Sequence, residues 1–311
     1  MVDGGRAPGT VLMLSHWPKS GTPAHLKDDL SAQIAFRWLD QQAAEPADLV
    51  SNDHFDEDGL VSVFALEQPE AALRQRELLI DVAAAGDFAV YRDRRAAQIA
   101  FTIACWNDPD RSPLGAQPFA LPYPQRAAAM YLELLPRLPE LMAAPERYRE
   151  HWADEAAHLD ESEDAIRSGA LVIEERPELD LAIVRTAGAA ARRTVHRFTQ
   201  QRQARWHPMA IHNATNCLRT LLIDGASYEL HYRYESWVQY MTRRPAPRVD
   251  LTPLAAELTA REPTGKWQFD GVKELAPRLW REGDSALAPE DVIERVTGFL
   301  ARGAPAWDPY D

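Results

Sequence analysis

The sequence of 311 residues predicts an α/β protein, with an N-terminal, mostly parallel sheet flanked by helices and a second, β-rich α+β domain. Short apolar runs alternate with amphipathic stretches over the first hundred residues, which is the pattern of a layered α/β unit. A proline-rich loop and a charged helical stretch then precede a region of short strand-like runs. We therefore expect an α/β metal-binding domain over 1–143, a helical connector over 144–170 and a β-rich substrate domain over 171–311.

Individual elements follow from the periodicity of the apolar residues. In the first domain we expect strands at 10–14, 48–51 and 78–82 and helices at 25–42 and 70–77. The apolar run 60–66 fits either a helix or a strand. In the second domain we expect strands at 180–185, 209–212, 219–223 and 227–238, a hairpin turn at Asp224-Gly225, and helices within 252–279 and 289–300.

Composition limits the classes of function. The chain carries 47 acidic and 34 basic residues and a formal charge of −13, so binding to long nucleic acids or anionic membranes is unfavourable. Two cysteines, without a CxxC pair, support neither a disulfide framework nor a thiolate zinc site. No secretion signal and no apolar run of membrane-spanning length is recognisable. These observations predict a soluble cytoplasmic protein with a small-molecule substrate, and they leave a homodimer open.

The segment Asp53-His54-Phe55-Asp56-Glu57-Asp58-Gly59 carries the clearest chemical signal. Four carboxylates and an imidazole lie within six positions, and that many carboxylates repel one another in a folded chain unless a cation neutralises them. Oxygen ligands with one imidazole suit Mn²⁺, Mg²⁺ or Fe²⁺. An EF-hand is excluded, because counting from His54 puts Ala65 at the position that requires a bidentate glutamate. The alternative is a solvated turn in which one aspartate caps a helix.

A strand followed by His-x-Asp-x-Asp-Gly resembles the first metal motif of the DHH-type phosphoesterases, with His54, Asp56 and Asp58 at the matching positions. The family's next motif is a single aspartate, for which Asp81 fits and Asp87 is a substitute. The likeness covers about residues 45–90, and the chain has no Asp-His-His triplet. The resemblance implies one or two divalent metals, Mn²⁺ first, and hydrolysis of a phosphoester by metal-activated water.

Further candidates lie in loops and at strand ends. His16 and Lys19 could contact substrate, although an ordinary connecting loop explains them equally well, and the P-loop order is absent. His212 could take part in catalysis with Asp56 and Asp58, although a structural role is more usual for a single histidine. Arg219 and Arg233 could hold a charged substrate. The spacing Glu155-Ala-Ala-His158 is more typical of a solvated helix than of a metal site.

The sequence therefore predicts a metal-dependent hydrolase of a small phosphorylated metabolite or short nucleotide. Its metal ligands are expected to come from His54, Asp56, Asp58, Asp81 and Asp87. One alternative is a metalloenzyme of other chemistry, such as a lyase or an oxygen-activating enzyme with a single Fe or Mn. The other is a non-enzymatic interaction protein in which the acidic segment is only a turn.

Overall fold

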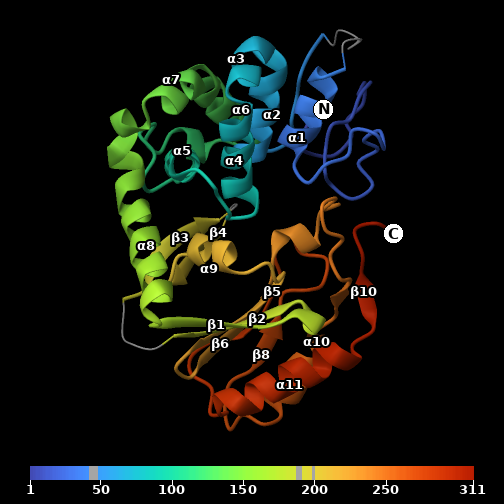
Figure 1. The fold of residues 1–311 in the computed structure, drawn as a ribbon, viewed down its shortest axis with the longest axis vertical. Coiled ribbons are helices and arrows are strands. Elements are labelled where there is room, and N and C mark those ends of the chain that lie inside the picture. Colours follow the sequence, from blue (N-terminus) through green and yellow to red (C-terminus); the bar gives the residue numbers. More distant parts are fainter. Residues whose placement is uncertain (42–47, 187–190, 198–199) are drawn as a thin grey trace. The chain divides into compact units, whose positions relative to one another are not determined.

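The computed structural model describes residues 1–41, 48–186, 191–197 and 200–311, and they form two compact units (Figure 1). The first unit contains residues 1–161, 191–213 and 240–242, and the second contains 162–190, 214–239 and 243–311. The units therefore alternate along the chain, whereas the sequence predicted continuous domains.

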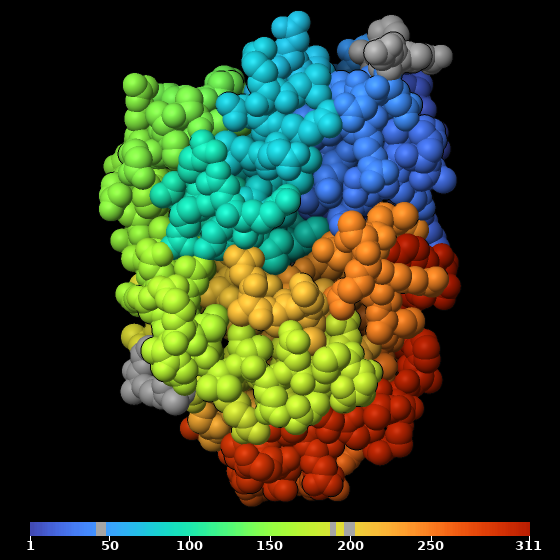
Figure 2. Space-filling view, viewed as in Figure 1, coloured from blue at the N-terminus to red at the C-terminus, as the bar shows by residue number. Residues whose placement is uncertain are grey.

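Helices dominate the first unit. Helix α4 packs against α2 and α5, because apolar residues at helical spacing give each of them a buried face. Figure 2 shows residues 1–41 in blue beside the light-blue and teal surface of the helices that follow. The elements are α1 (Ser31–Leu39), α2 (Glu57–Glu67), α3 (Pro69–Arg74), α4 (Arg76–Asp87), α5 (Arg94–Trp106), α6 (Tyr123–Leu134), α7 (Leu138–Ala143), most of α8 (Arg149–Ser168), β3 (Arg193–Arg197), β4 (Gln200–Ala204) and nearly all of α9 (Pro208–Ala214), with 3₁₀ turns at Pro118–Ala120, Leu135–Arg137 and Pro145–Tyr148.

Several expected strands are not strands. Residues 10–14 contribute only the isolated bridge between Val2 and Leu14, and 48–51 is irregular. Residues 78–82 lie within α4, where Leu78, Leu79 and Val82 are buried on one helical face. The run 60–66 is part of α2, and 209–212 is part of α9. Short apolar runs are ambiguous between a buried strand and one side of a helix, and here packing against neighbouring helices decides the outcome.

The mixed α/β class is confirmed, with the main sheet in the second unit. Its strand order is β1-β2-β5-β6-β9-β8, with β2 and β5 parallel and every other neighbouring pair antiparallel. The hairpin expected at Asp224-Gly225 joins β5 to β6, and Gly225 takes the positive φ of 61° that such a turn requires. The strands are β1 (Leu171–Arg176), β2 (Leu181–Thr186), β5 (Arg219–Asp224), β6 (Ser227–Tyr232), β8 (Trp267–Phe269) and β9 (Arg278–Arg281), and β7 (Arg248–Val249) pairs with β10 (Pro305–Trp307).

Two helices complete the core of the second unit. Figure 1 shows helices α10 (Thr252–Thr259) and α11 (Pro289–Arg302) beside the sheet. Their buried leucine and valine side chains belong to the same hydrophobic cluster as the inward residues of the sheet. Short 3₁₀ turns lie at Pro177–Leu179 and Tyr234–Ser236. None of the helices in the described segments combines the length and the apolar character that a membrane span requires.

Candidate metal centre

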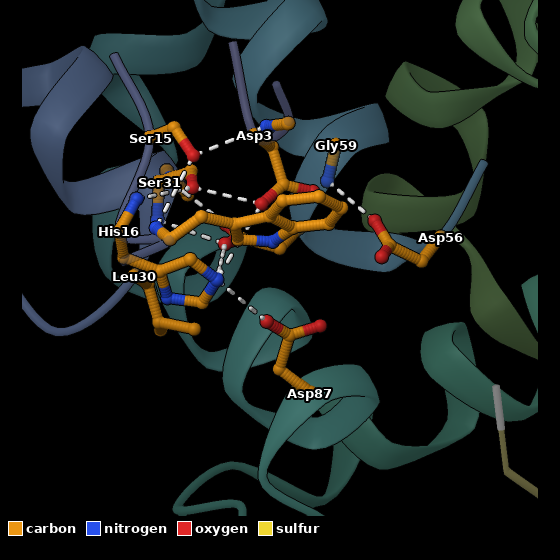
Figure 3. A network of polar contacts seen from close by, with 12 residues as sticks. Asp3, Ser15, His16, Leu30, Ser31, Asp56, Gly59 and Asp87 are labelled. Atoms are coloured by element: carbon orange, nitrogen blue, oxygen red, sulfur yellow. Dashed lines mark hydrogen bonds and ion pairs between the residues drawn. The ribbon is translucent and has the colours of Figure 1, made fainter. Parts of the chain in front are cut away.

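Acidic and imidazole side chains from four separate segments of the first unit meet at one buried place (Figure 3). The segments are the N-terminal residues, the loop before α1, the start of α2 and the end of α4. The side chains fall into two sets that share Asp3. The six residues are Asp3, His16, His54, Asp56, Asp58 and Asp87.

The first set surrounds His16. Its Nδ1 lies 2.7 Å from the backbone carbonyl oxygen of Asp29, and this contact assigns the ring proton to Nδ1. Nε2 then presents its lone pair to Asp3 Oδ1 and Asp87 Oδ2, each at 3.5 Å, and to Asp58 Oδ2 at 3.9 Å. An imidazole oriented by a backbone carbonyl, with its other nitrogen facing carboxylates, is the usual arrangement of a metal-binding histidine.

The second set surrounds His54, which lies closer to solvent. Its Nε2 lies 2.8 Å from Asp56 Oδ2 and 3.3 Å from Asp3 Oδ2, and its Nδ1 lies 2.9 Å from Asp53 Oδ1. The ring stacks on Trp17 at a centroid distance of 5.2 Å. The side chains of His54 and Asp56 are 19% and 18% exposed, whereas His16 and Asp58 are fully enclosed.

Asp3 joins the two sets, since Oδ1 faces His16 and Oδ2 faces His54. Ser31 Oγ donates a hydrogen bond to Asp3 Oδ1 at 2.8 Å. The backbone at Asp3 has a φ of 42°, in the left-handed region that non-glycine residues rarely adopt. Such backbone strain is concentrated at functional sites, where the surrounding structure holds it.

The start of α2 is built by hydrogen bonds to two of the aspartates. Asp56 is the N-cap residue and accepts a hydrogen bond from Gly59 N at 2.8 Å. Asp58 reaches across to α1 and accepts hydrogen bonds from the backbone nitrogens of Ser31 and Ala32 at 2.8 and 2.7 Å. Each carboxylate oxygen keeps a further lone pair for another ligand.

Gly59, the glycine of the His-x-Asp-x-Asp-Gly motif, is required for packing. It lies inside α2, and a Cβ at this position would come within 2.2 Å of Asn52 Nδ2 and 2.6 Å of Tyr131 Oη. Asn52 Nδ2 donates a hydrogen bond to Tyr131 Oη at 2.9 Å. Glycine is therefore required by the close approach of this pair to the helix.

Burial shifts the protonation of the His16 set. Burial lowers the pKa of His16 despite the nearby charge of Asp3, which favours the neutral ring. Burial, followed by the charges of neighbouring carboxylates, raises the pKa of Asp58 and of Asp87 well above the usual range. The folded chain therefore resists holding all these carboxylates ionised without a compensating cation.

The His54 set responds differently. Burial disfavours the charged ring, but the charge of Asp56 and the hydrogen bonds that the ring donates to Asp3 and Asp53 outweigh it, and the pKa of His54 is raised. Burial, followed by the charge of Asp3, raises the pKa of Asp56. An imidazolium at His54 and a metal ion are thus alternative ways of neutralising the same carboxylates.

The donor set fits hard divalent cations. It offers carboxylate oxygens and two imidazole nitrogens, which suits Mn²⁺, Mg²⁺ or Fe²⁺. In the part of the chain that the structure describes, the charged partners of Asp3, Asp56 and Asp58 are histidines, and no lysine or arginine pairs with them. A bound cation would supply the missing positive charge.

The sequence-predicted ligands divide into two groups. The structure brings His54, Asp56, Asp58 and Asp87 together. Asp81 lies elsewhere, where its carboxylate accepts hydrogen bonds from Arg92 N and Asp93 N just before α5. The sequence analysis placed Asp81 at the end of a strand, but residues 78–82 are part of helix α4, so Asp81 does not reach the cluster.

The other sequence-predicted residues lie outside the two sets. His212, on α9, has Nδ1 2.9 Å from the carbonyl oxygen of Phe88. Lys19 is exposed in the turn after His16. In the second unit, Arg219 donates hydrogen bonds to Leu179 O and Pro247 O, and Arg233 pairs with Glu235 and donates to Thr215 O, so both guanidinium groups hold the fold together.

Sequence reasoning missed Asp3 and assigned His16 to substrate binding. Asp3 is fifty positions from the acidic segment, and only the folded chain brings it there. One signal was present, because Asp3 precedes Gly4 and Gly5, and a Cβ on Gly4 would come within 2.5 Å of Asp53 Oδ1. The glycines let the N-terminal residues approach the acidic segment closely.

Comparison with known proteins identifies the family of this chain but no individual similar protein. No curated protein and no solved structure matches the chain. The sequence pattern of DUF6687, a family of unknown function, matches residues 1–311, and the chain therefore belongs to this family.

Proposed function

We propose that this protein is a metal-dependent hydrolase that cleaves a small phosphoester with two divalent cations, Mn²⁺ first, held by the cluster around Asp3. The observation that carries the proposal is the orientation of His16, whose Nε2 faces three buried carboxylates while Nδ1 is bonded to a backbone carbonyl. Without a cation, this arrangement sets a lone pair against negative charge at a buried position.

Each ligand set has a distinct role in the proposal. His16, Asp58 and Asp87 would hold the enclosed cation, His54 and Asp56 would hold the more exposed one, and Asp3 would bridge them. When bound, such cations lower the pKa of a bound water and neutralise charge on the phosphoryl oxygens. Water would then lose a proton and form the new bond to phosphorus, the ester P–O bond would break, and the released alkoxide would take up that proton.

Solvent exposure indicates where substrate would enter. His54 and Asp56 are the partly exposed members of the cluster, so substrate would approach from their side. Asp53 lies 2.9 Å from His54 Nδ1 and would hold the ring in position with Nε2 toward the cation. Phosphoester chemistry itself comes from the sequence resemblance of the segment at 54–59 to the first motif of the DHH-type enzymes.

A second candidate reaction is hydrolysis of a carboxylic ester or amide by the same centre. A pocket beside the cluster has Asp56, Glu57 and Glu155 in its lining, and of the described residues that line it none is a lysine or arginine. A phosphate group would therefore depend on the cations for its neutralisation, whereas a neutral ester would not.

Metal analysis of two matched variants tests the proposal. We expect about two equivalents of Mn²⁺ in the reconstituted wild type, a clear loss in Asp56→Asn and no loss in Asp81→Asn. Asp81 is a suitable control because its carboxylate is buried and hydrogen-bonded but lies outside the cluster. Equal metal content in all three proteins would refute the assignment of the centre.

An activity screen then separates the two reactions. The Mn²⁺-loaded protein is incubated with a panel of phosphomonoesters and phosphodiesters and with carboxylic esters and amides, with the metal-free protein as the blank. Phosphate release that requires metal and is lost in Asp56→Asn supports phosphoester hydrolysis. Turnover of carboxylic esters alone supports the second candidate, and no turnover by a metal-loaded protein contradicts both.

A further inference from the structure

A pocket of the first unit lies against the proposed metal centre. It has a volume of about 80 Å³, on a measure in which one water requires roughly 10–15 Å³, so it holds about six waters or one small ring. Asp56 belongs both to its lining and to the His54 set. A molecule in the pocket would therefore reach the more exposed of the two proposed cation positions.

Part of the wall is apolar and made largely of small residues. Helix α4 contributes Ala85 and Gly86, helix α5 contributes Ala100 and Ala104, and Phe101 adds an aromatic surface. A Cβ at Gly86 would come within 2.5 Å of the Glu57 side chain, so glycine here lets that carboxylate lie over α4 beside the pocket.

Ala89 also lines the pocket, directly after α4. Its φ of 51° lies in the left-handed region, which costs a residue with a Cβ about 1–2 kcal/mol. Asp3 in the cluster has the same unusual conformation. Two left-handed non-glycine residues thus occur at the pocket and at the centre that adjoins it, as expected of a functional site.

The wall also contains a polar pair, Glu155 and His207. His207 Nδ1 accepts a hydrogen bond from Met209 N at 3.2 Å, and Nε2 lies 3.4 Å from Glu155 Oε1. Both ring nitrogens are therefore engaged, and His207 holds the carboxylate in place. Arg111 Nη1 lies 3.5 Å from Glu155 Oε2 on its other side.

The environment of Glu155 and His158 differs from the one expected from their spacing in the sequence. The sequence favoured a solvated helix, but Glu155 and His158 are 8% and 3% exposed. His158 Nε2 lies 3.0 Å from the carbonyl oxygen of Arg205, and its ring is perpendicular to His207 at 5.5 Å. Helix α8 thus supplies a fixed hydrogen-bond acceptor to the pocket, in addition to Asp56 and Glu57.

We propose that this pocket binds the organic part of the substrate and that Glu155 selects it. The substrate class is a small monophosphate ester whose alcohol is a single ring or short chain carrying a hydrogen-bond donor, an amine or a hydroxyl, for the Glu155 carboxylate. A nucleoside polyphosphate is disfavoured, because the lining offers carboxylates and no lysine or arginine among its described residues. This inference rests on the proposed function.

Three aryl phosphates of similar size test the selection, and ATP serves as the polyphosphate. The aryl esters are 4-(aminomethyl)phenyl, 4-(hydroxymethyl)phenyl and 4-methylphenyl phosphate. We expect kcat/KM of the Mn²⁺-loaded protein to be at least about tenfold higher for a donor-bearing ester than for the 4-methyl ester, because a hydrogen bond to a charged group contributes that much. The better of the two donors distinguishes an amine from a hydroxyl substrate.

Glu155→Gln tests whether Glu155 determines the preference for a substrate with a hydrogen-bond donor. The amide keeps an acceptor for His207 but removes the charge, so the ratio of kcat/KM for the amine ester to that for the 4-methyl ester should fall about tenfold. Ala104→Phe fills the pocket and should lower kcat/KM for all three aryl esters at unchanged metal content. Ala157→Phe, at an exposed position of α8, is the matched control.

Failure of the inference is distinguishable from failure of the proposed function. Binding of 4-methylbenzylamine to the metal-free protein, followed by NMR, needs no turnover, and Ala104→Phe should abolish it. An unchanged kcat/KM for the aryl esters in Ala104→Phe, an unchanged amine preference in Glu155→Gln, or preferential turnover of ATP overturns the inference while the hydrolase stands. No turnover with metal bound contradicts the proposed function, and the amine titration then decides whether the pocket binds such a ligand.

Discussion

Replacing Asp87 by asparagine should change the stability of the protein in opposite directions with and without metal. Asp87 ends α4, is 1% exposed and faces His16 Nε2 at 3.5 Å. In the metal-free protein its ionised form lies among other buried carboxylates. The amide removes that charge and can donate a hydrogen bond to the His16 lone pair. With metal bound, the same change removes a ligand.

The size of the repulsion follows from the geometry. Asp87 Oδ2 and Asp3 Oδ1 both lie 3.5 Å from the same nitrogen, so they are at most 7.0 Å apart. At that separation two unit charges repel by roughly 2 kcal/mol with an effective dielectric constant of about 20. We therefore expect metal-free Asp87→Asn to be about 2 kcal/mol more stable than metal-free wild type at pH 8.

The effect depends on pH. Burial and neighbouring carboxylates raise the pKa of Asp87, so the folded chain keeps a proton that the unfolded chain releases. The resulting stability is present at low pH and is lost as pH rises from the unfolded pKa, about 4, toward the raised folded pKa. In metal-free Asp87→Asn this part of the pH dependence should disappear, and the two proteins should become similar in stability near pH 4.

Urea unfolding with EDTA and with saturating Mn²⁺, at pH 8 and near pH 4, measures both effects. Mn²⁺ should raise the unfolding midpoint of wild type much more than that of Asp87→Asn, since a ligand that binds only the folded state stabilises it. The reasoning is wrong if Asp87→Asn destabilises the metal-free protein as much as the metal-loaded one. That result would mean that the carboxylate stabilises the fold without a cation.

Three further substitutions test packing and backbone strain, each by the urea midpoint. Gly59→Ala should cost about 2 kcal/mol, because its Cβ would meet Asn52 Nδ2, whereas Gly298→Ala, whose Cβ has no atom nearer than 3.5 Å, should be neutral or stabilising. Ala89→Gly should stabilise the protein by up to about 1 kcal/mol by relieving a φ of 51°; destabilisation would contradict the strain argument. Arg248→Met should cost at least about 3 kcal/mol, since this fully buried guanidinium donates to backbone carbonyls and a serine hydroxyl; a loss below 1 kcal/mol would refute that role.

The sequence was informative where chemistry is local. The acidic segment holds His54, Asp56 and Asp58 within five positions, so their proximity needs little of the fold. Asp3 and Asp87 reach the same place only through the packing of the N-terminal residues and of α4 against α2. No local pattern encodes that packing, and a single sequence therefore could not identify the complete set.

The secondary-structure elements also divide into those set by local sequence and those set by packing. The hairpin at Asp224-Gly225 was predictable, because a two-residue turn has specific backbone requirements. The apolar run 78–82 was not, because its burial on one face of α4 depends on the helices beside it. The α/β class was predictable, but the sheet's location in the second unit was not, because the expected N-terminal strands are helical or irregular.

The unequal burial of the two ligand sets bears on how quickly ions would exchange with solvent. His16 and Asp58 have no exposed side-chain surface, and Asp58 is also held by two backbone N–H groups of α1. His54 and Asp56 reach solvent. An ion in the outer set would leave during ordinary dialysis, whereas an ion in the inner set would leave only when α1 and α2 separate locally. A preparation that retains one equivalent of metal ion would then have only the inner site filled. Inactivity of such a preparation would reflect the empty outer site rather than an unsuitable substrate.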